Sequence, residues 1–234
     1  MKKVWLVSVL ATALLGSMAA AQDYHHYVSG KGAAVRLENK LTGNGSNEAT
    51  QALYNVDHKK SDTVAGLRIA YGISMPLWGN NLRTELEYGY NGKAKLEGSA
   101  STPDLNYKSD IKSQFVMANV YYDFDLDSNW TPYVGAGIGY ARVKADNQVN
   151  FGGEVASLSK SSGNFAWNLT AGISYEMTDN LSIDASYRYI DYGKAKNSGN
   201  LELGAQKYRA HSHSKVRSNE LNLGVRYRLN YQNN

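Results

Sequence analysis

Apolar and polar residues alternate with a period of two along most of the chain after residue 22. This alternation is typical of β-strands that separate two environments, because successive side chains point to opposite faces of a sheet. The pattern occurs in eight segments, at residues 27–37, 64–75, 82–96, 112–124, 131–143, 164–177, 181–190 and 217–229. We therefore predict an all-β protein with eight strands.

The connections between these segments alternate in length. The short ones span residues 76–81, 125–130 and 178–180, and the long ones span about 38–63, 97–111, 144–163 and 191–216. An eight-stranded antiparallel up-and-down transmembrane β-barrel has this asymmetry, with short periplasmic turns and long extracellular loops. This arrangement places both termini in the periplasm.

The orientation of the two faces decides between a soluble and a membrane barrel. A soluble barrel would bury its apolar set, whereas a membrane barrel turns that set to lipid. Glycines on the polar face alternate with long charged side chains, for which they would leave space in a narrow lumen. Aromatic residues gather toward the ends of the apolar faces, as interfacial girdles do. They are Tyr90, Tyr140, Phe165, Trp167 and Tyr189 at one end, and Phe124, Tyr175 and Tyr227 at the other.

With the apolar set facing lipid, charged residues fill the interior and must find partners there. If Met75 pairs with Leu82, Arg68 lies opposite Gly89 and diagonal to Glu87. If the last hairpin pairs Arg188 with Glu220, Asp184 lies diagonal to Arg226. We predict a polar, salt-bridged lumen without a wide water channel. Its ion-pair network comprises Arg68, Arg83, Glu85, Glu87, Asp184, Arg188, Glu220 and Arg226.

The N-terminus resembles a secretory signal peptide at residues 1–21. Lys2 and Lys3 precede an apolar stretch, and Ala19 to Ala21 offer small residues for cleavage, so that Gln22 begins the mature barrel domain, 22–234. Loss of the two lysines lowers the formal net charge from +4 to +2, which removes the main support for nucleic-acid binding. Export and the absence of cysteine point to a bacterial envelope protein, and the predicted transmembrane barrel places it in the outer membrane.

The motifs that suggest chemistry have stronger structural explanations. Glu85 and Glu87 have the spacing of an acid–base pair on one strand face, but they fit a lumen ion-pair network better. The glycine-rich run 135–139 lies inside a strand and lacks the strand–loop–helix context of a nucleotide site. Residues 211–214, His-Ser-His-Ser, fall in a basic loop rather than on a lipid-facing strand. We therefore expect no enzyme activity, no cofactor and no metal site.

The last long loop is distinctly basic. It is either a solvated loop or a contact site for anionic partners, such as lipopolysaccharide phosphates or sulfated glycans on a host cell. The candidate residues are Lys207, Arg209, His211, His213 and Lys215.

Two stretches near the C-terminus and one in the fifth segment carry a family resemblance. Residues 187–194, together with 215–221 and 224–229, resemble the C-terminal hairpin of opacity-type (Opa/OmpA-like) small outer-membrane β-barrel surface proteins, and 131–140 resembles the fifth strand of that broader family. The end of the last segment also resembles the signal read by the barrel assembly machinery, although the chain continues to Asn234. Its residues are Asn222, Gly224, Tyr227 and Leu229.

This resemblance implies a non-enzymatic outer-membrane surface protein whose loops serve adhesion to host receptors or glycans, or envelope integrity. The alternative is a small porin-like pore, and a less favoured one is an outer-membrane enzyme that modifies lipid A. The partners implied are outer-membrane lipid, lipopolysaccharide, the assembly machinery and a host receptor or sulfated glycan.

Overall fold

A computed structural model of the chain describes residues 24–47, 53–99, 105–151, 154–203 and 206–229. Side chains are described for 24–38, 61–94, 110, 112–144, 161–193 and 215–229. The predicted signal peptide lies outside the described residues. In the part of the chain that is described, no helix is long and apolar enough to cross a membrane.

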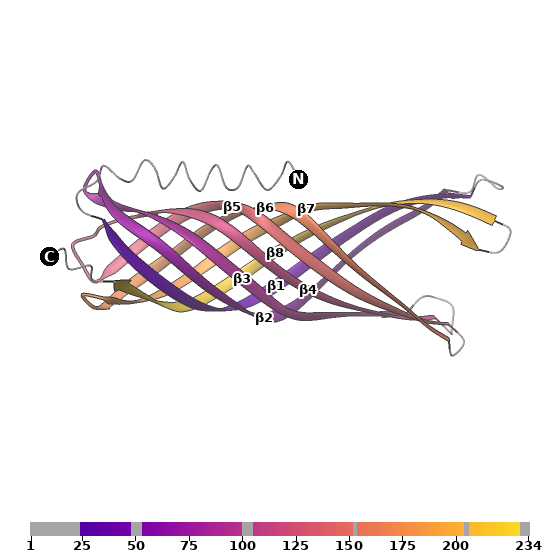
Figure 1. Cartoon of the computed structure of the whole chain (residues 1–234), viewed down its shortest axis with the longest axis horizontal. Coiled ribbons are helices and arrows are strands. Elements are labelled where there is room, and N and C mark those ends of the chain that lie inside the picture. Colours follow the sequence, from indigo (N-terminus) through magenta and orange to yellow (C-terminus); the bar gives the residue numbers. More distant parts are fainter. Residues whose placement is uncertain (1–23, 48–52, 100–104, 152–153, 204–205, 230–234) are drawn as a thin grey trace.

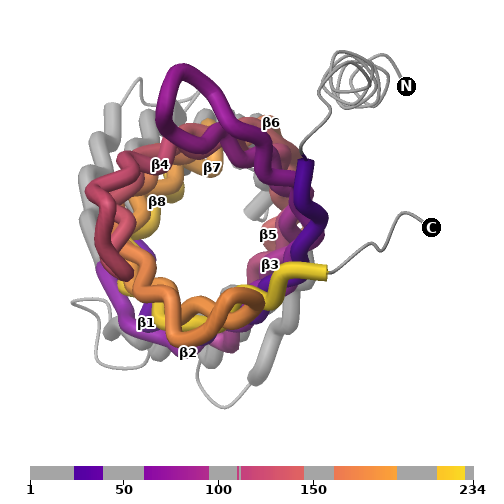
Figure 2. Tube along the Cα trace, turned by 90° about the vertical axis from the view of Figure 1, so that its left-hand side faces the viewer, coloured from indigo at the N-terminus to yellow at the C-terminus, as the bar shows by residue number. Residues whose placement is uncertain are grey.

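Eight antiparallel strands form one closed barrel in which each strand pairs with its neighbours in sequence and β8 pairs with β1. Figure 1 shows the barrel from the side and Figure 2 shows the closed ring of strands from one end. The predicted fold is therefore confirmed. The strands are β1 (His25–Asn47), β2 (Leu53–Leu77), β3 (Asn80–Ser99), β4 (Leu105–Asp123), β5 (Trp130–Phe151), β6 (Glu154–Thr178), β7 (Leu181–Leu203) and β8 (Gln206–Leu229).

The strands are staggered around the barrel. The cross-strand partners that begin at Tyr27 run through Gly72, Glu85, Asn119, Gly137, Asn168, Ile190 and Ser218 and return to β1 at Leu37. A closed barrel needs such a shift, because its strands tilt by roughly 35–45° to the barrel axis. The interior of an eight-stranded barrel is then just wide enough to be filled by side chains.

The predicted sidedness of the strands is confirmed. Leu67 and Leu223 lie on the outer surface with 60% and 64% of their area exposed, whereas Arg68, Glu87 and Arg188 are almost completely buried in the lumen. The register also agrees, since Met75 pairs with Leu82 and Arg68 lies opposite Gly89. Lipid imposes this arrangement, because it solvates apolar side chains and offers no partner to a charge.

The strands are longer than the alternation predicts. The segments expected as long loops, at 38–63, 97–111, 144–163 and 191–216, continue as paired strands over most of their length. The reason is that a strand beyond the lipid has water on its outer face and needs no apolar residues there. Its backbone pairing then leaves no alternating pattern in the sequence.

The cylinder divides at its distal end, which we define as the end opposite His25 and Leu229. Among the described residues, pairing between β2 and β3 stops at Gly66–Asn91, and pairing between β6 and β7 stops at Trp167–Asp191. The other neighbours remain paired much further, for example β1 with β2 as far as Ser46–Leu53. Two four-stranded sheets therefore diverge from the barrel, β7–β8–β1–β2 and β3–β4–β5–β6, as Figure 1 shows at its right-hand side.

Candidate functional site: a filled lumen beneath a divided end

The lumen near the proximal end is built around one arginine and three tyrosines. The Arg83 guanidinium lies over the rings of Tyr133, Tyr121 and Tyr27 at 4.7, 4.9 and 6.0 Å from their centroids. Its Nε donates a hydrogen bond to Asp123 Oδ2 at 2.6 Å. Cation–π contacts are strongest where the cation is desolvated, so this layer holds a buried arginine with few ionic partners.

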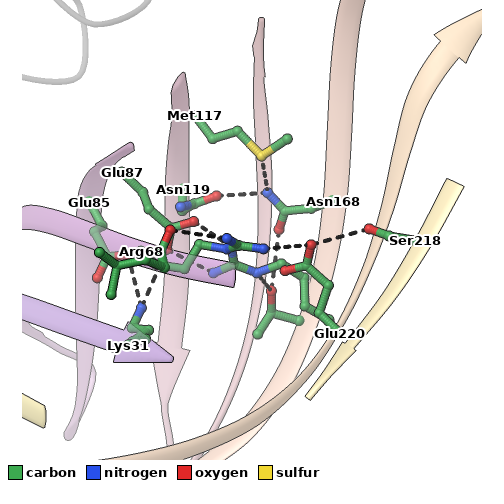
Figure 3. A network of polar contacts seen from close by, with 12 residues as sticks. Lys31, Arg68, Glu85, Glu87, Met117, Asn119, Asn168, Ser218 and Glu220 are labelled. Carbon is green, nitrogen blue, oxygen red and sulfur yellow. Dashed lines mark hydrogen bonds and ion pairs between the residues drawn. The ribbon is translucent and has the colours of Figure 1, made fainter. Parts of the chain in front are cut away.

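The middle layer is ionic, and its contacts cross the lumen (Figure 3). Arg188 on β7 makes a two-pronged salt bridge to Glu87 on the opposite strand β3. Lys31 on β1 lies 3.2 Å from Glu85 and 3.5 Å from Glu87. Because fork-shaped arginine–carboxylate pairs fix both distance and angle, they tie opposite walls of the barrel together.

The partner of Arg68 differs from the one that the strand register suggested. Its diagonal neighbour is Glu87, yet its Nη2 donates to Glu220 at 2.9 Å and to the Asn91 side chain at 2.6 Å. In so narrow a barrel an inward side chain meets the opposite wall as readily as its diagonal neighbour. The expected diagonal pair of Asp184 and Arg226 is present, with Nε and Oδ2 3.8 Å apart.

Every described cation in the lumen has a carboxylate partner within 4 Å. The pairs are Lys31–Glu85, Arg68–Glu220, Arg83–Asp123, Arg188–Glu87 and Arg226–Asp184. The predicted network omitted Asp123, although it lies within the predicted segment 112–124 and alternates onto the same inward face as Tyr121. One-to-one pairing matters, since an unpaired charge here would cost several kcal/mol.

Toward its distal end the lumen holds an apolar cluster. Val35 and Leu37 on β1 pack with Phe115 and Met117 on β4 and with Ile190 on β7, all of them buried. The outer face at this level becomes polar, with Arg36 and Arg142 exposed and bonded to serine hydroxyls. The predicted polar lumen therefore describes only the proximal and middle layers. Each strand keeps the same face inward along its length, and toward the distal end that face carries the apolar residues of a plug.

A small polar cavity of about 70 Å³ opens at the proximal mouth. Arg83, Asp123 and Arg226 contribute to its wall, and each has one buried polar atom without a hydrogen-bond partner among the described residues. Both donors and acceptors are left over, which is the environment that buried water satisfies. This mouth is suited to binding water rather than to the passage of ions, because the middle ionic layer closes the lumen on its distal side.

The residues of the resemblance to an assembly signal occupy two environments. Asn222 is buried in the lumen, and Gly224 packs so closely on Gly30 and Lys31 of β1 that a side chain would not fit. Tyr227 faces outward, and Leu229 pairs with His26 at the end of the closing β1–β8 ladder. The predicted recognition of this strand by the assembly machinery remains a prediction.

The basic segment of β8 lies in the divided end. The backbones of Lys207, Arg209, His211 and His213 belong to the strand, and their side chains lie outside the described residues. Lys215 is described, and its Nζ lies 3.6 Å from Asp191 Oδ2. This places the segment well away from the lumen network.

The two division points share a short sequence motif that the alternation analysis overlooked. Gly-Lys-Ala-Lys occurs at residues 92–95 on β3 and again at 193–196 on β7. The strand register shifts at both places, between Asn91 and Ala94 and between Asp191 and Lys194. A β-bulge of this kind bends a strand and can end its pairing, so the repeated motif marks where the cylinder opens. A search for internal repeats would have found it.

A closed eight-stranded barrel with lipid-facing apolar residues and a charge-paired lumen is the architecture of a small outer-membrane protein. The chain belongs to the outer membrane protein beta-barrel domain family, whose model matches residues 7–228. It is a protein of the bacterial outer membrane.

Among known proteins, the outer membrane protein PagN of Salmonella typhimurium is 31% identical, with 97% of this chain and 99% of that protein aligned. A putative adhesin of Rickettsia canadensis is 29% identical over 91% of this chain and 96% of its own length. Two solved structures share the fold. The outer membrane protein OprG of Pseudomonas aeruginosa has a TM-score of 0.59 at 16% identity and covers 90% of this chain and 98% of its own. Neisserial surface protein A has a TM-score of 0.50 at 24% identity and covers 88% and 99%.

Proposed function

We propose that this protein is a non-enzymatic adhesin whose divided distal end faces the outside of the cell and contacts a host surface. The observation that carries the proposal is the contrast between the two ends. The lumen is filled by ion pairs and an apolar plug, whereas the strands continue far beyond the aromatic girdle as two paired sheets. Such a molecule displays polypeptide above the membrane and is poorly suited to transport.

The sequence relatives support the same class of function. The Rickettsia canadensis relative is named a putative adhesin, and its similarity extends over nearly the whole of this chain. The aligned region therefore includes the barrel wall and also the distal strands. The distal strands are the part that would contact an adhesin's partner.

The geometry argues against the two alternatives. Glu85 and Glu87, the candidate acid–base pair, are both engaged by Lys31, and Glu87 is held by Arg188 as well. A carboxylate held in this way is poorly placed to exchange protons with a substrate. For a pore, ions would have to cross the middle ionic layer and then the apolar plug of Phe115, Met117 and Ile190.

We further propose that the anionic partner is a sulfated glycan bound by the basic segment of β8. Its support is the run of lysines, arginine and histidines between residues 207 and 215, placed on a strand of the distal end. Sulfate groups spaced along an extended chain match cations spaced along a strand. Attraction of this kind is weakened by salt, which offers a direct check on its origin.

The test measures adhesion of a non-adherent laboratory Gram-negative strain that produces this protein. The variant Lys207→Ala/Arg209→Ala should reduce binding to epithelial cells and to a heparin column by tenfold or more. The matched control, Lys59→Ala/Lys60→Ala, removes the same charge from β2 and should bind within twofold of the parent. Soluble heparin should block parental adhesion. The glycan proposal is overturned if both variants behave alike, and the adhesin proposal is overturned if the parent gives no adhesion above the empty strain.

A further inference from the structure

The four strand edges at the divided end lack a paired neighbouring strand on one side within the described ranges. We define the β2–β3 seam by the edges 53–65 and 92–99, and the β6–β7 seam by the edges 154–166 and 192–203. All four edges are strands, yet no pairing joins the members of either seam within the described ranges. An unpaired strand edge presents alternating N–H and C=O groups to whatever lies beside it.

The seams are placed symmetrically in the barrel. β3 and β7 are four strands apart in a ring of eight, so the two openings face opposite sides of the molecule. Each opening begins at a Gly-Lys-Ala-Lys motif with its β-bulge. The same device at opposite positions indicates that the openings are built into the fold.

Each seam is a wedge. At its base the two edges are hydrogen-bonded neighbours, Gly66 with Asn91 in one case and Trp167 with Asp191 in the other. The sheets then diverge toward the distal tips, as Figure 1 shows. One additional strand fits between two edges where their separation reaches roughly 10 Å, twice the ordinary strand spacing. A wedge that starts at one strand spacing and widens passes through that separation.

We propose that each seam binds an extended segment of a partner polypeptide by strand addition. The main chain of the segment would supply the missing hydrogen bonds, and its side chains would alternate between the two faces of the restored sheet. A glycan has no regular series of amide donors and acceptors, so this surface selects a polypeptide. This inference stands on strand pairing alone and does not depend on the glycan site of β8.

A second copy of this chain is a poor occupant. Lysines lie on the edges close to the division points, at Lys59 and Lys60 on β2, Lys93 and Lys95 on β3, and Lys194 and Lys196 on β7. Edge lysines oppose pairing between identical edges, because the like charges would be brought together. A partner with a different sequence meets no such barrier.

The experiment uses the full-length barrel in lipid nanodiscs and a phage-displayed library of random dodecapeptides. Selected peptides are synthesised again with N-methyl groups on either the odd or the even residues, which removes alternate main-chain donors and leaves the side chains intact. Methylation of at least one set should weaken binding tenfold or more, and hydrogen exchange should slow at seam amides. The proposal is overturned if the library yields no binder, or if both methylated forms bind within twofold of the parent peptide.

A pair of disulfides tests the seam itself, since the chain has no cysteine of its own. Ser61→Cys/Leu96→Cys continues the Gly66–Asn91 register and closes the β2–β3 seam when oxidised. The control, Ala65→Cys/Gly92→Cys, lies at the base, where the edges already touch. Peptides that protect β2–β3 amides should bind at least tenfold more weakly to the oxidised first variant, recover on reduction, and bind normally to the control. Unchanged peptide binding to the closed seam overturns the assignment of the binding site to the β2–β3 seam. Retention on heparin should be the same for both variants, oxidised or reduced.

Discussion

Asn91 and Tyr192 join the two division points of the barrel across the lumen. Asn91 is the last residue of β3 that pairs with β2, and Tyr192 directly follows the last residue of β7 that pairs with β6. The Asn91 Nδ2 donates a hydrogen bond to the Tyr192 hydroxyl at 3.1 Å, and both side chains are completely buried. The places where the two sheets separate are therefore held to each other from inside, which fixes the level at which the cylinder opens.

Tyr192→Phe should destabilise the barrel by about 1–3 kcal/mol, because the hydroxyl also contacts Ser218 and Glu220 and its loss leaves buried polar groups short of a partner. The measurement is the temperature at which the folded band converts to the unfolded one on a semi-native gel. Tyr140→Phe removes a hydroxyl from an exposed outward ring and should leave that temperature nearly unchanged. Equal shifts for the two variants would contradict the cross-lumen role.

The Arg188–Glu87 salt bridge gives the second prediction. Arg188→Leu leaves the buried Glu87 with Lys31 as its remaining salt-bridge partner among the described residues, and removing one member of a buried pair costs about 3–5 kcal/mol. The double variant Arg188→Leu/Glu87→Leu should recover much of this loss in urea unfolding, since it leaves no orphan carboxylate. At the rim, Arg228 and Glu176 are nearly half exposed, so Arg228→Leu should cost about 0–1 kcal/mol. A single variant as stable as the parent would remove the network's structural role.

The eight strands and their sidedness could be predicted because lipid demands an apolar residue at every second position. Leu67 on β2 and Leu223 on β8 face outward for that reason. The charged residues that alternate with the apolar ones along each strand face inward. Toward the distal end the inward face also carries apolar residues, such as Val35 and Phe115, and the outer face carries the exposed Arg36 and Arg142, so polarity no longer marks the two faces. Strand ends and the apolar plug were therefore beyond the reach of the alternation pattern.

The pairs across the lumen were less predictable than the register. Register follows from local turn geometry, and the opposition of Arg68 and Gly89 came out as expected. The contact between Arg68 and Glu220 depends on the stagger of the closed barrel, which no local pattern encodes. The division of the cylinder was missed for a related reason, since it appears as a repeated motif and not as a change in hydrophobicity.

Gly193 provides the third prediction. Its φ is +78°, and a Cβ placed there would lie 2.8 Å from the Phe165 carbonyl oxygen on β6. Gly193→Ala should therefore combine a left-handed backbone cost of about 1–2 kcal/mol with a steric clash. Gly79 has nearly the same φ, +76°, and open space around it, so Gly79→Ala isolates the backbone cost. Urea unfolding should show a larger loss at residue 193, and equal losses would mean that β6 yields without penalty.

The filled lumen predicts that the protein does not conduct ions, because two barriers lie in series along it. Ions would have to pass the salt-bridged middle layer and then the apolar plug, and a path in series is limited by whichever barrier remains. Planar bilayers containing the parent protein should show no discrete steps or only very small ones.

Phe115→Ala/Tyr192→Ala thins the plug, and Arg188→Ser/Glu87→Ser opens the middle layer without changing the net charge. Each pair alone should remain almost silent, whereas the four substitutions together should give resolved steps. The control, Leu67→Ala/Leu169→Ala, removes comparable volume from the lipid face and should stay silent, with folding checked by gel mobility throughout. Large steady steps from the parent would show that the lumen is open and would favour a pore over an adhesin.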